Sequence, residues 1–327
     1  MNFKSLCKFR APSIAIMVGV IVAISSNNSH GSTIKETKTT HVVDTANLGV
    51  PLNYQVGSLY VQQIGNSKNG AAPLILIPGL SSGGYVWDQT VQRLKDKHTL
   101  YVITLAGFNG TAAIDGPKMA KAKDSLRELI ISKGINKPIL VGHSLGATLS
   151  IWFSETNSDL VRGVFAVDGL AVLPRSEGMN LEQRKAMADG MKKQMLGQSQ
   201  EVFAAQQLKY MNTIGVIDGE TAKKLGELSG KSDPDAVTEY MTEIFAMDLR
   251  KDLAAIKVPF TIISPYYATD MLAYGISEQQ KTEYYAGLHE GAAQLKVVSI
   301  NNSRHFPMYD QPEIFAEKLQ SFVDEVK

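Results

Sequence analysis

A pentapeptide with a serine between two glycines, Gly142-His143-Ser144-Leu145-Gly146, constrains this chain more than any other feature. It follows the apolar run 138–141 and precedes the apolar segment 145–153, which predicts a buried strand, a tight turn and a helix. A serine at the tip of such a turn has a strained backbone, and side chains in place of Gly142 and Gly146 would collide with their surroundings. The N-terminus of the following helix would favour negative charge beside the serine. The pattern is typical of a nucleophilic serine displayed at the end of a strand.

Short apolar runs alternate with longer amphipathic segments from about residue 57 onward. Strands are expected at 57–64, 74–77, 100–103, 138–141, 164–167, 260–263 and 295–300. Helices are expected between them at 85–96, 118–134, 145–157 and 312–325. Continuous apolar strands that alternate with helices are covered on both faces. The sequence therefore predicts an α/β fold with a mostly parallel central sheet and helices on both faces.

The alternation is interrupted once, between Pro174 and Ala255, where no buried-strand pattern occurs. Segments 186–195 and 236–247 have the pattern of amphipathic helices, and the second follows a helix-start signal. We therefore expect a helical cap, or lid, inserted at 174–255. The insertion divides a core that consists of residues 57–173 and 256–327, and residues 32–56 form an N-terminal leader segment.

The first 31 residues have the features of a secretory signal peptide. Lys4, Lys8 and Arg10 precede an apolar stretch at 11–24, and small polar residues follow it. This stretch is shorter than the roughly 20 residues that span a bilayer. We expect a signal peptide at 1–31 and export to the periplasm or the medium. The alternative is an uncleaved N-terminal anchor, and only in that case is a membrane expected as a partner.

Composition excludes several classes of protein. The chain has 33 Lys and Arg against 32 Asp and Glu, so it lacks the basic field that a nucleic-acid partner requires. The single cysteine, Cys7, excludes an internal disulfide framework and a cysteine-based metal site. The sequence contains neither a P-loop nor a His-Glu-x-x-His motif. We therefore expect no nucleic-acid partner, no metal and no cofactor.

His305 is the candidate base for Ser144. A serine hydroxyl is a poor nucleophile until a base removes its proton. Among the six histidines, His305 is the last and lies in a loop after the final strand. Such loops, at the carboxyl ends of strands, are where open α/β sheets bind ligands.

The acid that would orient His305 is Asp168 or Asp270. A carboxylate is needed to fix the imidazole tautomer and to stabilise the imidazolium. Asp168 directly follows the strand 164–167, whereas Asp270 comes six residues after Ser264, in a tyrosine-rich loop. Both precede His305, so chain order leaves both candidates open, with a slight preference for Asp168.

Two main-chain amides are candidates for an oxyanion hole. One belongs to Leu145, the residue after the serine. The other belongs to Leu80, in the turn Pro78-Gly79-Leu80 after the first buried strand.

Together these motifs resemble the α/β-hydrolase superfamily, in its cap-bearing branch of small-molecule hydrolases. The resemblance covers about residues 57–325. It is carried by Ile77-Pro78-Gly79-Leu80, the serine pentapeptide, Asp168 and Asp270, and Arg304-His305-Phe306. It implies an acyl-transfer enzyme with a Ser–His–acid triad and no cofactor, whose helical lid at 174–255 shapes the acyl pocket.

Two departures from the family pattern accompany the resemblance. Pro78 stands where many relatives have a histidine, and Tyr266-Tyr267-Ala268-Thr269 stands where the commoner acid loop has an aspartate. The serine nucleophile argues against the dehalogenase and epoxide-hydrolase branches, which use an aspartate.

The expected function is that of an exported serine hydrolase acting on a small carboxylic ester or lactone. One alternative is an aminopeptidase or amidase with the same triad, which would need an acidic patch such as Glu239, Glu243 and Asp248 to hold an amino group. A second alternative is a ligand-binding protein that keeps the fold without catalysis.

Overall fold

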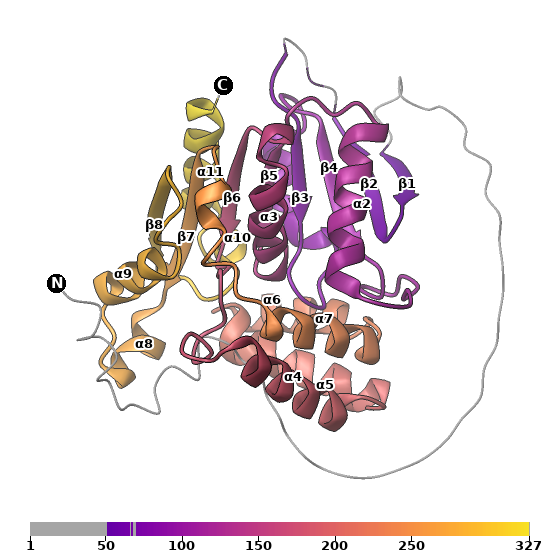
Figure 1. Cartoon of the computed structure of the whole chain (residues 1–327), viewed down its shortest axis with the longest axis vertical. Helices are drawn as coiled ribbons and strands as arrows, with labels where there is room; N and C mark the ends of the chain where they lie inside the picture. The colour runs from indigo at the N-terminus through magenta and orange to yellow at the C-terminus, as the bar shows by residue number, and fades with distance from the viewer. Residues whose placement is uncertain (1–50, 66, 68–69, 327) are drawn as a thin grey trace.

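A computed structural model of the chain describes residues 51–65, 67 and 70–326. Its centre is an eight-stranded sheet with the order β1-β2-β4-β3-β5-β6-β7-β8 (Figure 1). The strands are β1 (Leu52–Val56), β2 (Leu59–Ile64), β3 (Leu74–Ile77), β4 (Leu100–Leu105), β5 (Ile139–His143), β6 (Gly163–Val167), β7 (Phe260–Tyr266) and β8 (Leu295–Asn301). β2 is antiparallel to β1 and β4, and every other pairing is parallel. The predicted mostly parallel α/β sheet is confirmed.

Helices cover both faces of this sheet because the central strands are apolar on both sides. Along β3, Leu74 and Leu76 pack into one hydrophobic cluster, whereas Ile75 and Ile77 pack into another. The first cluster includes residues of α1 (Asp88–Leu94) and α11 (Pro312–Glu325), and the second includes residues of α2 (Lys118–Ser132) and α3 (Leu145–Thr156). These helices match the four that the sequence predicts, although Gly84–Trp87 forms a 3-10 turn before α1.

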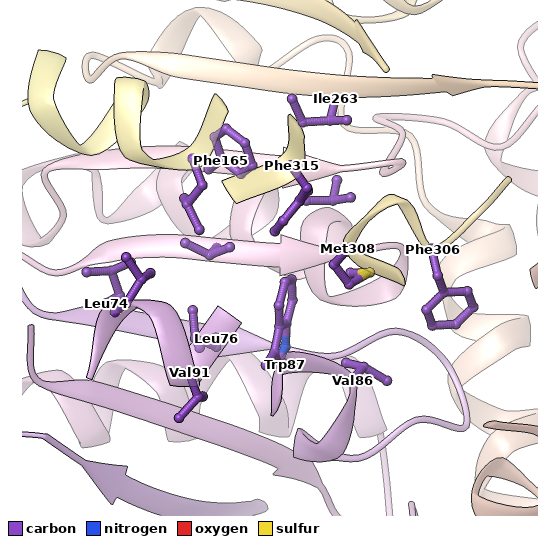
Figure 2. Close-up of a cluster of buried hydrophobic side chains, with 14 of the residues drawn as sticks. Leu74, Leu76, Val86, Trp87, Val91, Phe165, Ile263, Phe306, Met308 and Phe315 are labelled. Atoms are coloured by element: carbon purple, nitrogen blue, oxygen red, sulfur yellow. The ribbon is translucent and has the colours of Figure 1, made fainter. Parts of the chain in front are cut away.

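Aromatic side chains fill the core on the α11 side. Phe315 of α11 lies between Phe165 of β6 and Trp87, with ring centroids 5.9 Å and 6.3 Å away (Figure 2). All three side chains are almost completely buried. This packing fixes the central strands, whose ends carry the loops described below.

The segment between β6 and β7 is helical, as the sequence predicts. It forms α4 (Leu181–Met195), α5 (Gln200–Tyr210), α6 (Gly219–Ser229) and α7 (Pro234–Ala246), which lie together at one end of the sheet (Figure 1). Side chains of Asn180, Ser199, Asp218 and Asp233 cap the four N-termini by accepting backbone hydrogen bonds. A π-helical turn, Met211–Gly215, follows α5 directly. Residues 174–255 are called the insert below.

Other elements were outside the prediction or at different boundaries. β1 pairs with β2 in the sheet, so the predicted leader at 32–56 is wrong for residues 52–56, which belong to the core. The strand was missed because exposed polar residues, Asn53 and Gln55, alternate with half-buried ones at this edge of the sheet. Two further helices, α8 (Ala268–Met271) and α9 (Glu278–Leu288), lie between β7 and β8. The short helix α10 (Pro307–Asp310) precedes α11.

The predicted signal peptide at 1–31 and the leader up to residue 50 lie outside the described residues. Among the helices of the described part of the chain, none combines the length and the apolar character needed to cross a membrane.

Candidate active site

The serine pentapeptide forms the strand–turn–helix arrangement that its sequence predicts. Ser144 follows β5, begins α3 and has φ 52° and ψ −116°, a conformation that side chains rarely adopt. Its amide donates a hydrogen bond to the Val167 carbonyl at 2.8 Å, which ties the turn to the end of β6. A Cβ at Gly142 would lie 2.3 Å from the Gly146 carbonyl oxygen, and one at Gly146 would lie 2.3 Å from that of Ile77. Only glycine fits at these two positions.

The turn after β3 packs against Ser144. The Ser82 amide donates to the Gly79 carbonyl at 3.1 Å, and Ser81 has a φ of 61°. A Cβ built on Gly79 would lie 3.0 Å from Ser144 Cβ, so the backbone of this turn approaches the serine closely. Leu80 and Leu145, the predicted oxyanion-hole residues, line the same cavity as Ser144.

His305 and Asp168 form a close pair beside the same cavity. His305 Nδ1 lies 2.5 Å from Asp168 Oδ2, and the two side chains are only 13% and 10% exposed. β6 and β8 position the pair, because Asp168 directly follows Val167 and His305 lies in the loop after Asn301. The geometry leaves Nε2 as the imidazole nitrogen available to a hydroxyl.

Asp270 does not contact His305. It lies on α8 and forms a bidentate ion pair with Arg304. Arg304 Nε lies 2.8 Å from Asp270 Oδ2, and Arg304 Nη2 lies 3.1 Å from Asp270 Oδ1. Arg304 Nη1 also donates to the carbonyls of Asn212 and Val216 in the insert. Asp270 therefore acts on the residue before His305 and not on the imidazole itself.

Burial and neighbouring charges act in opposite directions on Asp168. Desolvation raises the pKa of this carboxyl, but the Lys281 ammonium, His305 and hydrogen bonds from His305 and Tyr285 outweigh it. The net effect is a pKa of about 2, so the carboxylate is ionised over the physiological range.

His143 packs against the loop that carries His305 and is hydrogen-bonded to it. Its side chain is fully buried, and Nε2 donates to the His305 carbonyl at 2.9 Å. Its ring centroid lies 4.5 Å from that of His305 and 4.3 Å from that of Phe306. Burial lowers the pKa of His143 to about 3, so the imidazole is neutral. In the sequence, His143 is only the variable position of the serine motif.

Ser144, His305 and Asp168 share a cavity of about 160 Å³ between the core and the insert. The core contributes Gly79, Leu80, Ser81, His143, Leu145, Thr148, Gly169, Leu170, Leu173, Tyr285 and Phe306 to its lining. The insert contributes Met195, Phe203, Gln206, Gln207, Tyr210, Val237, Met241 and Ile244. Lysine, arginine and glutamate are absent from the described residues that form this lining.

The three acidic residues considered for binding an amino group are already paired. Glu239 lies 2.9 Å from Lys118 Nζ and 3.0 Å from Lys192 Nζ. Glu243 accepts hydrogen bonds from the Lys118 and Met119 amides at the start of α2. Asp248 pairs with Arg184 and Arg250. These carboxylates fasten the insert and do not line the cavity.

Several residues beside the Ser144–His305–Asp168 group belong to no recognisable sequence motif. Tyr285 and Lys281 of α9 lie next to Asp168, and Tyr210 of α5 lies edge-on to the His305 ring at 6.1 Å. A lysine on the face of α9 that also carries Tyr285 and Leu288 was the available signal, because a buried lysine requires a negative partner.

Comparison with known proteins identifies relatives over most of the chain. Residues 74–318 match the family described as "Alpha/beta hydrolase family". A pimeloyl-[acyl-carrier protein] methyl ester esterase of Vibrio cholerae is 24% identical over 272 residues, which cover 81% of this chain and 98% of that protein.

Solved structures share the fold. The enol-lactonase from Burkholderia xenovorans superposes with a TM-score of 0.62 at 17% identity, covering 84% of this chain and 100% of the other. A thermophilic esterase from Thermogutta terrifontis, solved with malate bound, gives a TM-score of 0.64 at 18% identity, covering 85% and 99%.

Proposed function

The chain belongs to the α/β hydrolase family, and from this premise we propose that it is a serine hydrolase that cleaves a small, uncharged carboxylic ester or lactone. The observation that carries the proposal is the arrangement of three side chains, Ser144, His305 and Asp168, around one cavity. A serine on a strained strand–helix turn opens onto the same cavity as a buried histidine–carboxylate pair 2.5 Å apart.

In the proposed mechanism Ser144 Oγ attacks the carbonyl carbon while His305 Nε2 takes the hydroxyl proton. Asp168 accepts the hydrogen bond from His305 Nδ1 and stabilises the imidazolium. The Leu80 and Leu145 amides donate to the oxyanion. When the intermediate collapses, the C–O bond breaks and the leaving alkoxide takes the proton from His305. Water then attacks the acyl-enzyme with His305 again as the base, which releases the acid and Ser144.

The lining of the cavity supports an uncharged substrate. A carboxylate on the substrate would find no cationic partner among the described lining residues, and the charge of Asp168 would repel it. Phe203, Val237 and Ile244 offer apolar contacts to an acyl group, and the amides of Gln206 and Gln207 can bind a neutral polar group. An ester or lactone substrate also agrees with the activities for which the Vibrio cholerae esterase and the Burkholderia xenovorans enol-lactonase are named.

The aminopeptidase or amidase alternative has less support. It requires a free acidic patch near the cavity, whereas Glu239, Glu243 and Asp248 all have cationic or amide partners. We retain the ester hydrolase and assign no role in substrate binding to these carboxylates.

Export forms a further part of the proposal. It rests on three features of residues 1–31: the basic residues Lys4, Lys8 and Arg10, the short apolar stretch at 11–24, and the small polar residues that follow it. Intact-mass measurement of the protein expressed in its full-length form tests it. A mature chain that begins near residue 32 is expected, and retention of residues 1–31 would indicate the membrane-anchored alternative.

Ser144→Ala tests the proposed activity, with Ser154→Ala as the matched control. Ser154 is a buried serine of the same helix, does not line the cavity, and donates its hydroxyl to the Ser150 carbonyl. Hydrolysis of p-nitrophenyl butyrate should fall by about 1,000-fold or more in Ser144→Ala and change little in Ser154→Ala. A wild-type rate in a folded Ser144→Ala protein would refute the proposal.

A further inference from the structure

The side of Asp168 that faces away from His305 contacts α9, which the mechanism above does not use. Tyr285 donates its hydroxyl proton to Asp168 Oδ1, while His305 binds Oδ2. The two oxygens of one carboxylate are therefore held by two different elements. Tyr285 is 2% exposed, so its hydroxyl is withdrawn from solvent together with the carboxylate.

Lys281 adds a buried positive charge on the same face of α9. It lies four residues before Tyr285, which places the two side chains one above the other on the helix. Lys281 is 6% exposed, and its ammonium lies 5.4 Å from the centre of the Tyr285 ring. It also donates a hydrogen bond to the Pro265 carbonyl of β7. A buried ammonium is stable only near negative charge.

Asp168 is the carboxylate that supplies the negative charge for Lys281. Lys281 interacts electrostatically with Asp168 and Asp270, and both carboxylates favour its charged form against the effect of burial. Asp270 already has a two-pronged partner in Arg304. Asp168 has no such guanidinium, so Lys281 is the cation that balances it.

We propose that Tyr285 and Lys281 are positioning residues that hold the Asp168 carboxylate ionised and directed at His305. This inference rests on the proposed function. When the imidazole accepts the serine proton, the carboxylate must neither rotate away nor take up a proton itself. Tyr285 fixes the rotation by binding the second oxygen, and Lys281 opposes protonation by its charge.

Asp270 and Arg304 line a small cavity together with Asp168 but pair with each other, and the groups that approach Asp168 from β5 and α5 are neutral. His143 approaches from β5 and Tyr210 from α5, and burial keeps both uncharged by lowering the pKa of the histidine and raising that of the tyrosine. Tyr285 is likewise kept neutral, because burial raises its pKa. Apart from His305, Lys281 is thus the side chain whose charge acts on Asp168 within the described structure.

Tyr285→Phe tests the proposal, and the adjacent Tyr284→Phe is its control. Tyr284 donates its hydroxyl to Glu177 and meets the Tyr285 ring edge-on at 6.3 Å, so both variants remove one hydroxyl that is hydrogen-bonded to a carboxylate from the same helix. In Tyr285→Phe we expect kcat to fall about tenfold with KM unchanged, because a hydrogen bond to a charged group is lost. The acid limb of the kcat/KM profile should move to higher pH, because the carboxylate then attracts the imidazole proton more strongly.

Lys281→Met should move the acid limb in the same direction, because a positive charge beside the imidazole is removed. Tyr284→Phe should leave kcat and the pH profile at wild-type values. An unchanged profile in Tyr285→Phe would overturn the proposal. So would equal losses in Tyr285→Phe and Tyr284→Phe, since these would indicate a merely structural effect.

A spectroscopic readout separates this inference from the proposed function. The proton that His305 Nδ1 shares with Asp168 should give a far-downfield proton NMR resonance, which requires no turnover. It should shift in Tyr285→Phe and stay in place in Tyr284→Phe. An inactive wild-type protein that shows this selective shift would refute the proposed function and support the positioning role. A resonance that is insensitive to both substitutions would refute the positioning role, whatever the activity.

Discussion

Three residues around the cavity have backbone conformations that side chains rarely adopt. Ser81, Ser144 and Asp168 have φ values of 61°, 52° and 49°, and all three line the cavity. Each such conformation costs on the order of 1–3 kcal/mol for a residue other than glycine. Strain gathered at one cavity, and held there by buried central strands, is expected where geometry serves chemistry. It supports the roles proposed for Ser144 and Asp168.

Replacing each candidate acid by its amide distinguishes them. Asp168→Asn should lower kcat by about 1,000-fold or more, because an amide cannot stabilise the imidazolium and favours the wrong tautomer. Asp270→Asn should lower kcat by less than about tenfold and reduce the melting temperature, because it weakens the ion pair with Arg304. Steady-state kinetics and thermal unfolding of both variants provide the measurement. The opposite ranking of the two kcat values would assign the acid to Asp270.

Sequence alone could predict the serine and histidine positions but not the acid. The glycines around Ser144 are required by contacts of 2.3 Å, so the motif itself encodes the turn. The choice between Asp168 and Asp270 depends on how the loop after β7 folds, and that loop forms α8 in place of returning to His305. Arg304, adjacent to His305 in sequence, then binds Asp270. Neither the short helix nor the ion pair has a local sequence signal.

At the scale of elements, the insert is bonded directly to the loop that carries His305. The His305 and Phe306 amides donate to the Ile214 and Gly215 carbonyls at 3.2 Å and 3.0 Å. These carbonyls belong to the π-helical turn Met211–Gly215, a conformation that often occurs at functional sites. This turn therefore forms part of the support of the His305 loop.

His289 links α9 to the loop after β6 and makes the fold sensitive to acid. The Ala171 amide donates to its Nε2 at 3.0 Å, and its Nδ1 donates to the Tyr285 carbonyl at 2.8 Å, which requires a neutral ring. Burial lowers the pKa of His289 from 6.5 to about 4. The unfolded chain therefore binds a proton that the folded chain excludes between these values. His289 stabilises the fold above this window, and its contribution is lost as the pH falls through it.

Urea unfolding at pH 7, 6 and 5 measures this effect. One excluded proton makes the free energy of unfolding fall by about 1.4 kcal/mol for each pH unit within the window. His289→Gln should remove about that much from the slope, because glutamine does not titrate. Its stability at pH 7 should also be lower, since the two hydrogen bonds are disturbed. Equal slopes in wild type and variant would contradict the role assigned to His289.

Elements were predictable from the sequence where burial is strong. β3 and β6 are apolar along their whole length, and the predicted strands agree with them within one residue. β5 extends two residues beyond the predicted strand 138–141, through Gly142 and His143 of the serine motif. β1 was missed because half of its residues face solvent at the sheet edge. α9 was missed because Tyr285 and Leu288 share their buried face with a lysine, which weakens the apolar pattern.

At the scale of the whole molecule, the cavity exists only because two segments distant in sequence meet. Residues after β3, β5, β6 and β8 form its floor, and α4, α5 and α7 of the insert form its cover. Sequence periodicity predicted that the insert is helical, but it does not determine which helix faces point inward. The apolar and uncharged character of the pocket could therefore be read only from the folded chain.

The charged side chains of the insert and of the cavity also have different arrangements. Glu239 and Glu243 bind Lys118 and Met119 of α2, which fastens the insert to the core, whereas the Arg184–Asp248 and Lys192–Glu239 pairs lie within the insert. Of the ionisable pairs among the described residues, only His305–Asp168 lines the cavity. Lys281 interacts with Asp168 from outside this lining.

The most direct test of the central claim, that Ser144 is a nucleophile activated by His305, is labelling with a fluorophosphonate followed by peptide mass mapping. In the wild-type protein we expect one phosphonylated peptide, which contains Ser144. The label should be absent in Ser144→Ala and should form far more slowly in His305→Ala. A folded wild-type protein that takes up no label, or takes it up at another serine, would contradict the account.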